Sequence, residues 1–305
     1  IPTEFLDEAL DKFAQFFVSP LLAEETMKAE RIAIDNEFQS AVLVDVLRAT
    51  RLLQTCMIHD HPASNFFNGN LISLEHNVDK QNIDIRDRVK AHWDRFYSPE
   101  IMTTVVYAPL PLNETQESVL PYLNIIPSKK NSSQYCLDFS WTNIFDKNKF
   151  LRLFKVKTIK SAKILTLSWV TPPQIKLYKT KPLQFLAFIL GHEGEGSLFS
   201  YLKTKNYVYK LAAGPSPDGT LYNSHFSVFQ ISLELSQDGL KNLKEIVEAI
   251  FHYIDLISSS NQLERIFKEV AVQSYMDFMF SHLDEPFSIT YGIASSMKVF
   301  PPEDY

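Results

Sequence analysis

The chain has 305 residues, enough for two domains of ordinary size, and its 45% apolar and 22% charged residues are typical of a globular protein. The net charge is −6 and there is no basic stripe, so nucleic acid is not expected as a partner. No apolar run is long enough to cross a bilayer, which argues against a membrane partner. The two cysteines, Cys56 and Cys136, form no disulfide framework and favour a reducing compartment, so we expect a cytoplasmic location.

Three helices and one strand are predicted in the first third of the chain. Apolar residues at positions 6, 10, 13 and 17 share one helix face, which predicts a helix that ends before Pro20. A longer helix is expected over residues 23–57, because neither Pro nor Gly interrupts it. Apolar spacing predicts another helix over residues 83–97, and a β-rich run predicts a strand over residues 102–108.

A linker between two domains is predicted near the middle of the chain. Prolines at positions 109, 111, 121 and 127, followed by polar residues from 128 to 134, interrupt the periodic patterns between residues 109 and 149. We therefore divide the chain into residues 1–135 and residues 136–305.

Strands and helices alternate in the second part. The β-rich runs predict strands over residues 151–157, 163–170, 207–213 and 226–235. Helices are expected over residues 183–203, where glycines interrupt the pattern, and over residues 237–257 and 262–280. Antiparallel-type strands mixed with helices indicate the α+β class, with a sheet packed against helices.

Two glutamates in the second predicted helix are candidates for a metal site. Glu30 and Glu37 are seven residues apart, which places both carboxylates on one helix face, whereas Asp35 points elsewhere. A carboxylate on a rigid helix is a suitable zinc ligand, and a second carboxylate nearby can orient it. Such pairs are also common on solvated helices, so the spacing alone does not identify a site.

The segment Gly191-His-Glu-Gly-Glu-Gly-Ser197 is the most unusual stretch of the chain. Three glycines in six residues let another backbone approach closely and permit positive φ. The pattern is neither a phosphate-binding loop nor a nucleophile elbow, because the glycine and serine positions differ from both. Taken alone, the segment favours a structural contact between helices.

Longer phrases of this sequence resemble the insulinase (pitrilysin) family of zinc metallopeptidases. These phrases are Leu10-Asp-Lys-Phe-Ala-Gln-Phe-Phe17 with Pro20-Leu21, then Glu30 to Glu37, then GHEGEGSLFSYLK from residue 191 with Lys205-Asn-Tyr-Val208, and Tyr291-Gly-Ile-Ala294. Their order is collinear with the family over nearly the whole chain. The resemblance implies two homologous insulinase-type domains, each an antiparallel-rich sheet packed with helices, the first of them truncated at its N-terminus.

The resemblance also implies a zinc-dependent metalloendopeptidase that cleaves peptides in an enclosed chamber. In this family an H-x-x-E-H box supplies two His ligands and the catalytic Glu, and a distant Glu completes the Zn²⁺ site. Glu37 matches that distant Glu ligand, and Glu30 matches an acidic residue that supports it. The sequence contains no H-x-x-E-H box, so we expect no catalytic residue in this chain, little or no bound Zn²⁺, and no activity by itself.

The family binds the N-terminus of its substrate at an exosite made of the glycine-rich segment and a nearby strand edge. By position, the resemblance assigns this exosite to Gly191, Glu193, Leu211 and Ala213. It implies peptide substrates as partners, together with a missing N-terminal segment and a missing C-terminal half of the same enzyme.

Two interpretations of the whole protein remain open. The chain is either part of an active zinc metallopeptidase or a non-catalytic insulinase-like homologue that acts as a peptide-binding or scaffolding subunit. The presence of both Glu30 and Glu37 favours the enzyme, because a protein without catalysis has no need of a carboxylate pair at a metal site. An H-x-x-E-H box upstream in the coding sequence would decide between them.

Overall fold

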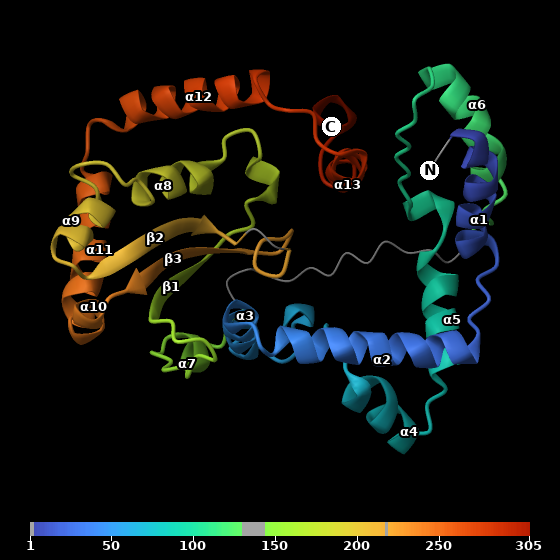
Figure 1. The fold of residues 1–305 in the computed structure, drawn as a ribbon, viewed down its shortest axis with the longest axis horizontal. Helices are drawn as coiled ribbons and strands as arrows, with labels where there is room; N and C mark the ends of the chain where they lie inside the picture. Colours follow the sequence, from blue (N-terminus) through green and yellow to red (C-terminus); the bar gives the residue numbers. More distant parts are fainter. Residues whose placement is uncertain (1–2, 130–143, 217–218) are drawn as a thin grey trace. The chain divides into compact units, whose positions relative to one another are not determined.

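The computed structural model describes residues 3–129, 144–216 and 219–305 (Figure 1). The chain divides into two compact units, each built from segments far apart in the sequence. Unit 1 comprises residues 1–49, 65–138 and 284–305, and unit 2 comprises residues 50–64 and 139–283. The predicted boundary between residues 135 and 136 lies outside the described residues, as does Cys136, and that division stays a prediction.

Unit 1 is helical in its described residues and forms no strand there, so the sheet expected in this part is not formed by them. The predicted first helix is confirmed as α1, which packs against α6. The predicted helix over residues 83–97 is confirmed as α5, whose N-cap Asp84 accepts hydrogen bonds from the amides of Arg86 and Asp87 at 2.8 and 3.3 Å. The helices are α1 (Leu6–Val18), α2 (Glu24–Ala41), α4 (Asn77–Lys80), α5 (Ile85–Phe96), α6 (Leu112–Leu123) and α13 (Pro286–Ser296), with α3 (Asp45–Thr55) running on into unit 2.

The long helix expected over residues 23–57 is wrong, because the structure divides it into α2 and α3. A short turn follows Ala41, with the amide of Val44 donating to the carbonyl of Ala41 at 3.0 Å. Asp45 begins α3, and its carboxylate pairs with Arg48 at 2.8 Å. An acidic residue is favoured at a helix N-terminus, which explains a new start without Pro or Gly.

Two further predictions for the first half of the chain are corrected. Residues 102–108 are extended but form no strand, because no described strand lies beside them to complete a ladder. The interval predicted as a linker contains α6, which starts directly after Pro111 and carries Pro121 in its last turn. Proline is tolerated at the start of a helix, so its presence did not exclude one there.

Unit 2 contains a three-stranded antiparallel sheet of order β1-β3-β2. The strands are β1 (Ile164–Thr171), β2 (Val208–Pro215) and β3 (Ser227–Leu235). These confirm three of the four predicted strands, whereas residues 151–157 form none. The central β3 pairs Leu233 with both Leu165 of β1 and Leu211 of β2.

Helices cover the sheet of unit 2 and bury its apolar face, so the α+β class is confirmed. Alternate residues of β3, from Phe229 to Leu235, are buried and pack against side chains of α8, α9 and α11. In Figure 1, α8 runs over β2 and the glycine-rich segment joins α8 to α9. The helices are α7 (Lys147–Phe150), α8 (Pro182–Leu190), α9 (Leu198–Thr204), α10 (Gln237–Lys241), α11 (Leu243–Ser258) and α12 (Leu263–Met279).

Within the described part of the chain, none of the helices is both long and apolar enough to span a membrane. The cytoplasmic location expected from the cysteine content stays a prediction. Cys56 is buried and is a free thiol, and burial raises its pKa above the ordinary value of 9.0.

Candidate functional site: a glycine-rich segment beside an open strand edge

The glycine-rich segment is held firmly at both of its ends. At one end Gly191 closes α8, and its amide donates to the carbonyl of Ala187 at 2.8 Å. At the other end the buried Ser197 is the N-cap of α9, and its hydroxyl accepts a hydrogen bond from the amide of Ser200 at 3.1 Å. Gly196 has a φ of +80°, a conformation that side chains other than glycine rarely adopt. The segment is therefore positioned by the fold.

Gly191 brings this segment against the backbone of β2. A Cβ atom at position 191 would lie 2.9 Å from the carbonyl oxygen of Ala187 and 3.9 Å from the amide nitrogen of Ala213. One strand residue further on, a Cβ at Gly214 would contact the Cβ of Ala187 at 3.4 Å. The small residues thus allow the end of α8 to approach the C-terminal half of β2 closely. Gly191 and Ala213, which lie 22 residues apart in the sequence, are neighbours in space.

β2 is an edge strand of the described sheet. One of its edges pairs with β3, from Val208–Leu235 to Pro215–Phe229, with an irregularity between Val208 and Lys210. No strand among the described residues pairs with its other edge. An edge strand presents unpaired N–H and C=O groups that can hydrogen-bond an extended peptide.

The four residues assigned to the exosite differ in what they can offer. The side chain of Leu211 is buried in the core of unit 2, so Leu211 can contribute only its backbone to a ligand. Ala213 is half-buried and also offers backbone groups. Glu193 is exposed and follows Gly191 by two residues, so its carboxylate is available to a ligand. These assignments stay a prediction, and the geometry is compatible with them.

A shallow hollow of about 270 Å³ borders the other end of the segment. Gly196, Ser197 and Tyr201 form one wall, and Tyr253 with His252 of α11 forms the other. Burial raises the pKa of Tyr253, and the amide of Leu198 partly offsets this by hydrogen-bonding to it. The hollow is mostly apolar and can hold one side chain.

The two predicted metal-site glutamates lie on α2 of unit 1. Both Glu30 and Glu37 are exposed in the structure, so an inward orientation of Glu37 is not what the described residues show. Asp35, by contrast, is half-buried. Its carboxylate accepts a hydrogen bond from the amide of Leu71 at 3.0 Å. The shared face was correctly derived from the spacing, but burial depends on what packs against that face. The ligand role of Glu37 stays a prediction.

The described residues do not complete a zinc site. No three His, Cys, Asp or Glu side chains come close enough together in this part of the chain to hold a metal ion. A zinc site needs three or four protein ligands, and Glu37 could supply one of them.

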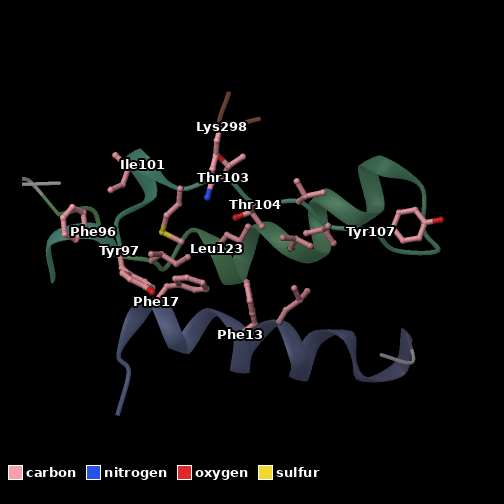
Figure 2. Close-up of a pocket in the computed structure, with 16 residues that line it drawn as sticks. Phe13, Phe17, Phe96, Tyr97, Ile101, Thr103, Thr104, Tyr107, Leu123 and Lys298 are labelled. Atoms are coloured by element: carbon pink, nitrogen blue, oxygen red, sulfur yellow. The ribbon is translucent and has the colours of Figure 1, made fainter. Parts of the chain in front are cut away.

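A cavity of about 560 Å³ in unit 1 was not predicted from the sequence (Figure 2). Figure 2 shows it between α1 and residues 101–107, with Phe13 and Phe17 of α1 pointing toward it. The apolar face of α1 was the available signal in the sequence, and Phe13 on that face is 48% exposed. Other lining residues include Tyr97, Val105, Leu123 and Lys298.

Comparisons with known proteins identify the family. The family described as "Peptidase M16 inactive domain" matches residues 84–269. Nardilysin of Rattus norvegicus is 31% identical over all of this chain, which spans 26% of that protein. The insulin-degrading enzyme-like 1, peroxisomal, of Arabidopsis thaliana is also 31% identical over all of this chain, which spans 31% of it.

A solved structure shows the same fold. The crystal structure of pitrilysin superposes with a TM-score of 0.84 at 22% identity, over 99% of this chain and 31% of that one. The chain thus spans between about a quarter and a third of these relatives' length. The family match covers more than half of the chain, and the resemblance found in the sequence is confirmed. This chain belongs to the M16 family of peptidases, to which the insulinase-type enzymes belong.

Proposed function

We propose that this chain is the peptide-binding part of a zinc-dependent metalloendopeptidase of the insulinase family. The intact enzyme would enclose its peptide substrate in a chamber that other parts of the same enzyme complete. The main supporting observation is the open edge of β2 beside the glycine-rich segment, since it offers backbone groups and a carboxylate at one place. The peptidase relatives support the reaction class.

In this proposal an extended peptide pairs with the open edge of β2. Leu211 and Ala213 would supply backbone hydrogen bonds, and Gly191, which has no side chain, lets the glycine-rich segment lie close to Ala213. The carboxylate of Glu193 would bind the positively charged N-terminus of the peptide. Such recognition depends on the peptide backbone and its amine, so many sequences could bind.

The zinc ion would supply the hydrolytic chemistry in the intact enzyme, by activating a water molecule. Glu37 would contribute one ligand from α2, and Glu30, two turns earlier on the same helix, would orient it. The remaining ligands are absent from this sequence, which holds no H-x-x-E-H box. The chain by itself is therefore proposed to bind peptides without cleaving them.

The test measures peptide binding to the 305-residue chain by fluorescence polarisation, with a short peptide labelled at its C-terminus. The free-amine peptide should bind about tenfold more tightly than its N-acetylated form, because a hydrogen-bonded charge pair is lost on acetylation. Glu193→Gln should remove most of this difference, and Gly191→Ala should weaken binding of both forms.

The matched control for the glycine variant is Gly219→Ala, because a Cβ atom at position 219 meets no atom within 4 Å. It should bind like the unaltered chain. Equal affinity for both peptide forms, or binding that neither Glu193→Gln nor Gly191→Ala alters, would contradict the proposed exosite.

The second candidate function is that of a non-catalytic peptide-binding or scaffolding subunit. The description of the matched family as an inactive domain favours it. Both candidates use the same strand edge, so peptide binding does not separate them. The longer coding sequence does: an H-x-x-E-H box upstream of residue 1 supports the enzyme, and its absence there supports the subunit.

A further inference from the structure

One face of α2 is held by polar contacts with the segment that leads into α4. Arg31 and Asp35 are four residues apart, so they lie one above the other on this face. The carboxylate of Asp35 accepts a hydrogen bond from the amide of Leu71 at 3.0 Å. The guanidinium of Arg31 donates to the carbonyl of Leu74 at 3.4 Å and lies 3.8 Å from the carboxylate of Glu75. Both turns of the helix are thus tied to the same segment.

Close apolar contacts hold the same face of α2. Phe38, seven residues after Arg31, packs its ring edge to face on that of Phe66, with the ring centroids 5.4 Å apart. Gly69 has a φ of +76°, and a Cβ atom there would lie only 3.0 Å from Cγ2 of Ile34. Glycine at this position therefore lets the segment approach the helix closely.

The segment that holds α2 is itself fixed by reciprocal hydrogen bonds. The hydroxyl of Ser73 accepts a hydrogen bond from the amide of Asn70 at 3.0 Å, and the side-chain oxygen of Asn70 accepts one from the amide of Ser73 at 2.9 Å. The carbonyl of Asn70 also accepts from the amide of Leu74 at 2.8 Å. Reciprocal bonds of this kind stabilise the start of a helix, so the segment is a firm support.

These contacts matter because α2 has little else to orient it. A helix is usually oriented by an apolar face that it buries against its neighbours. Among the described residues, none of the side chains of α2 is fully buried. The rotation of the helix about its axis therefore depends on the specific contacts of Arg31, Asp35 and the two residues that pack beside them.

The rotation of α2 decides where its two glutamates point. Glu30 directly precedes Arg31 and Glu37 directly precedes Phe38, so both carboxylates lie about 100° around the helix from the held face. A carboxylate at the helix surface is about 5 to 6 Å from the axis, so a rotation of about 20° would move it by about 2 Å. Metal–ligand distances tolerate only about 0.2 Å. A metal ligand on this helix therefore needs a fixed rotation.

We infer that Asp35 is a positioning residue for Glu37. Its hydrogen bond to the amide of Leu71 sets the rotation of α2 and so the direction of the Glu37 carboxylate, and Arg31 supports it one turn earlier. Asp35 itself lies about 200° around the helix from Glu37, so it acts through the helix and does not touch the metal. This inference rests on the proposed function, in which Glu37 is a zinc ligand.

The experiment measures the zinc affinity of the full-length protein, expressed from the coding sequence that contains these 305 residues, by competition with a chelator. Asp35→Ala should weaken zinc binding about tenfold, as expected when a group that orients a metal ligand is lost. Asp35→Asn should stay within about threefold of the unaltered protein, because its amide oxygen still accepts from Leu71 through a weaker, uncharged hydrogen bond.

Two controls accompany these variants. Asn36→Ala removes a side chain of similar size from the next position of α2, where it is exposed, and should leave the zinc affinity unaltered. Urea unfolding of each variant shows that the protein is folded when zinc is measured. A merely structural role of Asp35 would lower the free energy of unfolding and leave the zinc affinity of the folded protein unchanged.

Glu37→Gln separates this inference from the proposed function. If the full-length protein binds no zinc, or if Glu37→Gln binds it as tightly as the unaltered protein, the proposed metal site itself fails. If Glu37→Gln loses zinc and folded Asp35→Ala does not, the positioning role is refuted and the ligand role stands. An equal loss in Asp35→Ala and Asp35→Asn, or an equal loss in Asn36→Ala, also refutes the role of the Leu71 hydrogen bond.

Discussion

At the scale of single residues, His61 of unit 2 shows how burial changes the pKa of a side chain. His61 is buried, with its ring 6.1 Å from that of Phe226, and its Nδ1 accepts a hydrogen bond from the amide of Ala63 at 3.1 Å. This acceptor role requires an unprotonated Nδ1. Burial, followed by the charge of His225, lowers the pKa of His61 below its ordinary value of 6.5. The folded chain therefore favours the neutral ring.

The lowered pKa of His61 predicts how stability changes with pH. Below about pH 6.5 the unfolded chain binds a proton that the folded chain resists, so stability falls as the pH falls, by at most about 1.4 kcal/mol per pH unit. His61→Phe should reduce this slope in urea unfolding between pH 7 and pH 5. His252→Gln, an exposed histidine on α11, should leave it unaltered. An unchanged slope in His61→Phe would show that other groups cause the pH dependence.

At the scale of elements, close backbone contacts hold the helices of unit 2 to its sheet. Gly239 in α10 is buried, and a Cβ atom there would lie 2.0 Å from the carbonyl oxygen of Tyr207, just before β2. The same carbonyl accepts a hydrogen bond from the amide of Ser236 at 2.9 Å, and the Ser236 hydroxyl caps α10. α10 therefore positions the start of β2, the strand that carries the candidate site.

Gly239→Ala should destabilise unit 2 by about 2 kcal/mol or more, because the backbone carbonyl of Tyr207 has to move. The measurement is the free energy of unfolding in urea. Gly219→Ala should change it by less than about 0.5 kcal/mol, since position 219 has open space around it. A loss of similar size in both variants would mean that the contact at Gly239 is not the cause.

At the scale of the whole molecule, the chain has an open strand edge among its described residues but no complete zinc motif in its sequence. Its described residues form no metal-binding cluster, and its sequence holds no H-x-x-E-H box. We predict that the chain, incubated with zinc and then dialysed, retains far less than one zinc ion per molecule by elemental analysis. Glu37→Gln should not change this content, because one carboxylate alone binds zinc weakly. Retention of one zinc per chain would reveal a ligand set that the proposal lacks.

The elements that could be predicted are those whose signal is local. The alternating apolar residues of β3 and the apolar spacing of α1 and α5 each point to one secondary structure without reference to the rest of the chain. The strand expected over residues 102–108 does not form, although its residues are β-rich. A strand exists only when another strand completes its hydrogen bonds, and a local pattern does not reveal that partner. The helix α6 was missed because prolines were taken as helix breakers: Pro111 is at the N-cap, which tolerates proline, and Pro121 lies inside the last turn although proline is normally unfavourable there.

The sequence by itself determined the family, through long motifs in a collinear order, such as the motif that begins at Gly191. It also determined which residues of that motif have charged side chains. Only the tertiary structure decided that Gly191 meets Ala213, that Leu211 turns its side chain into the core, and that Glu37 is exposed. The physical reason is that a motif is a property of neighbouring residues in the chain. Burial and an open strand edge depend on which distant segments pack together.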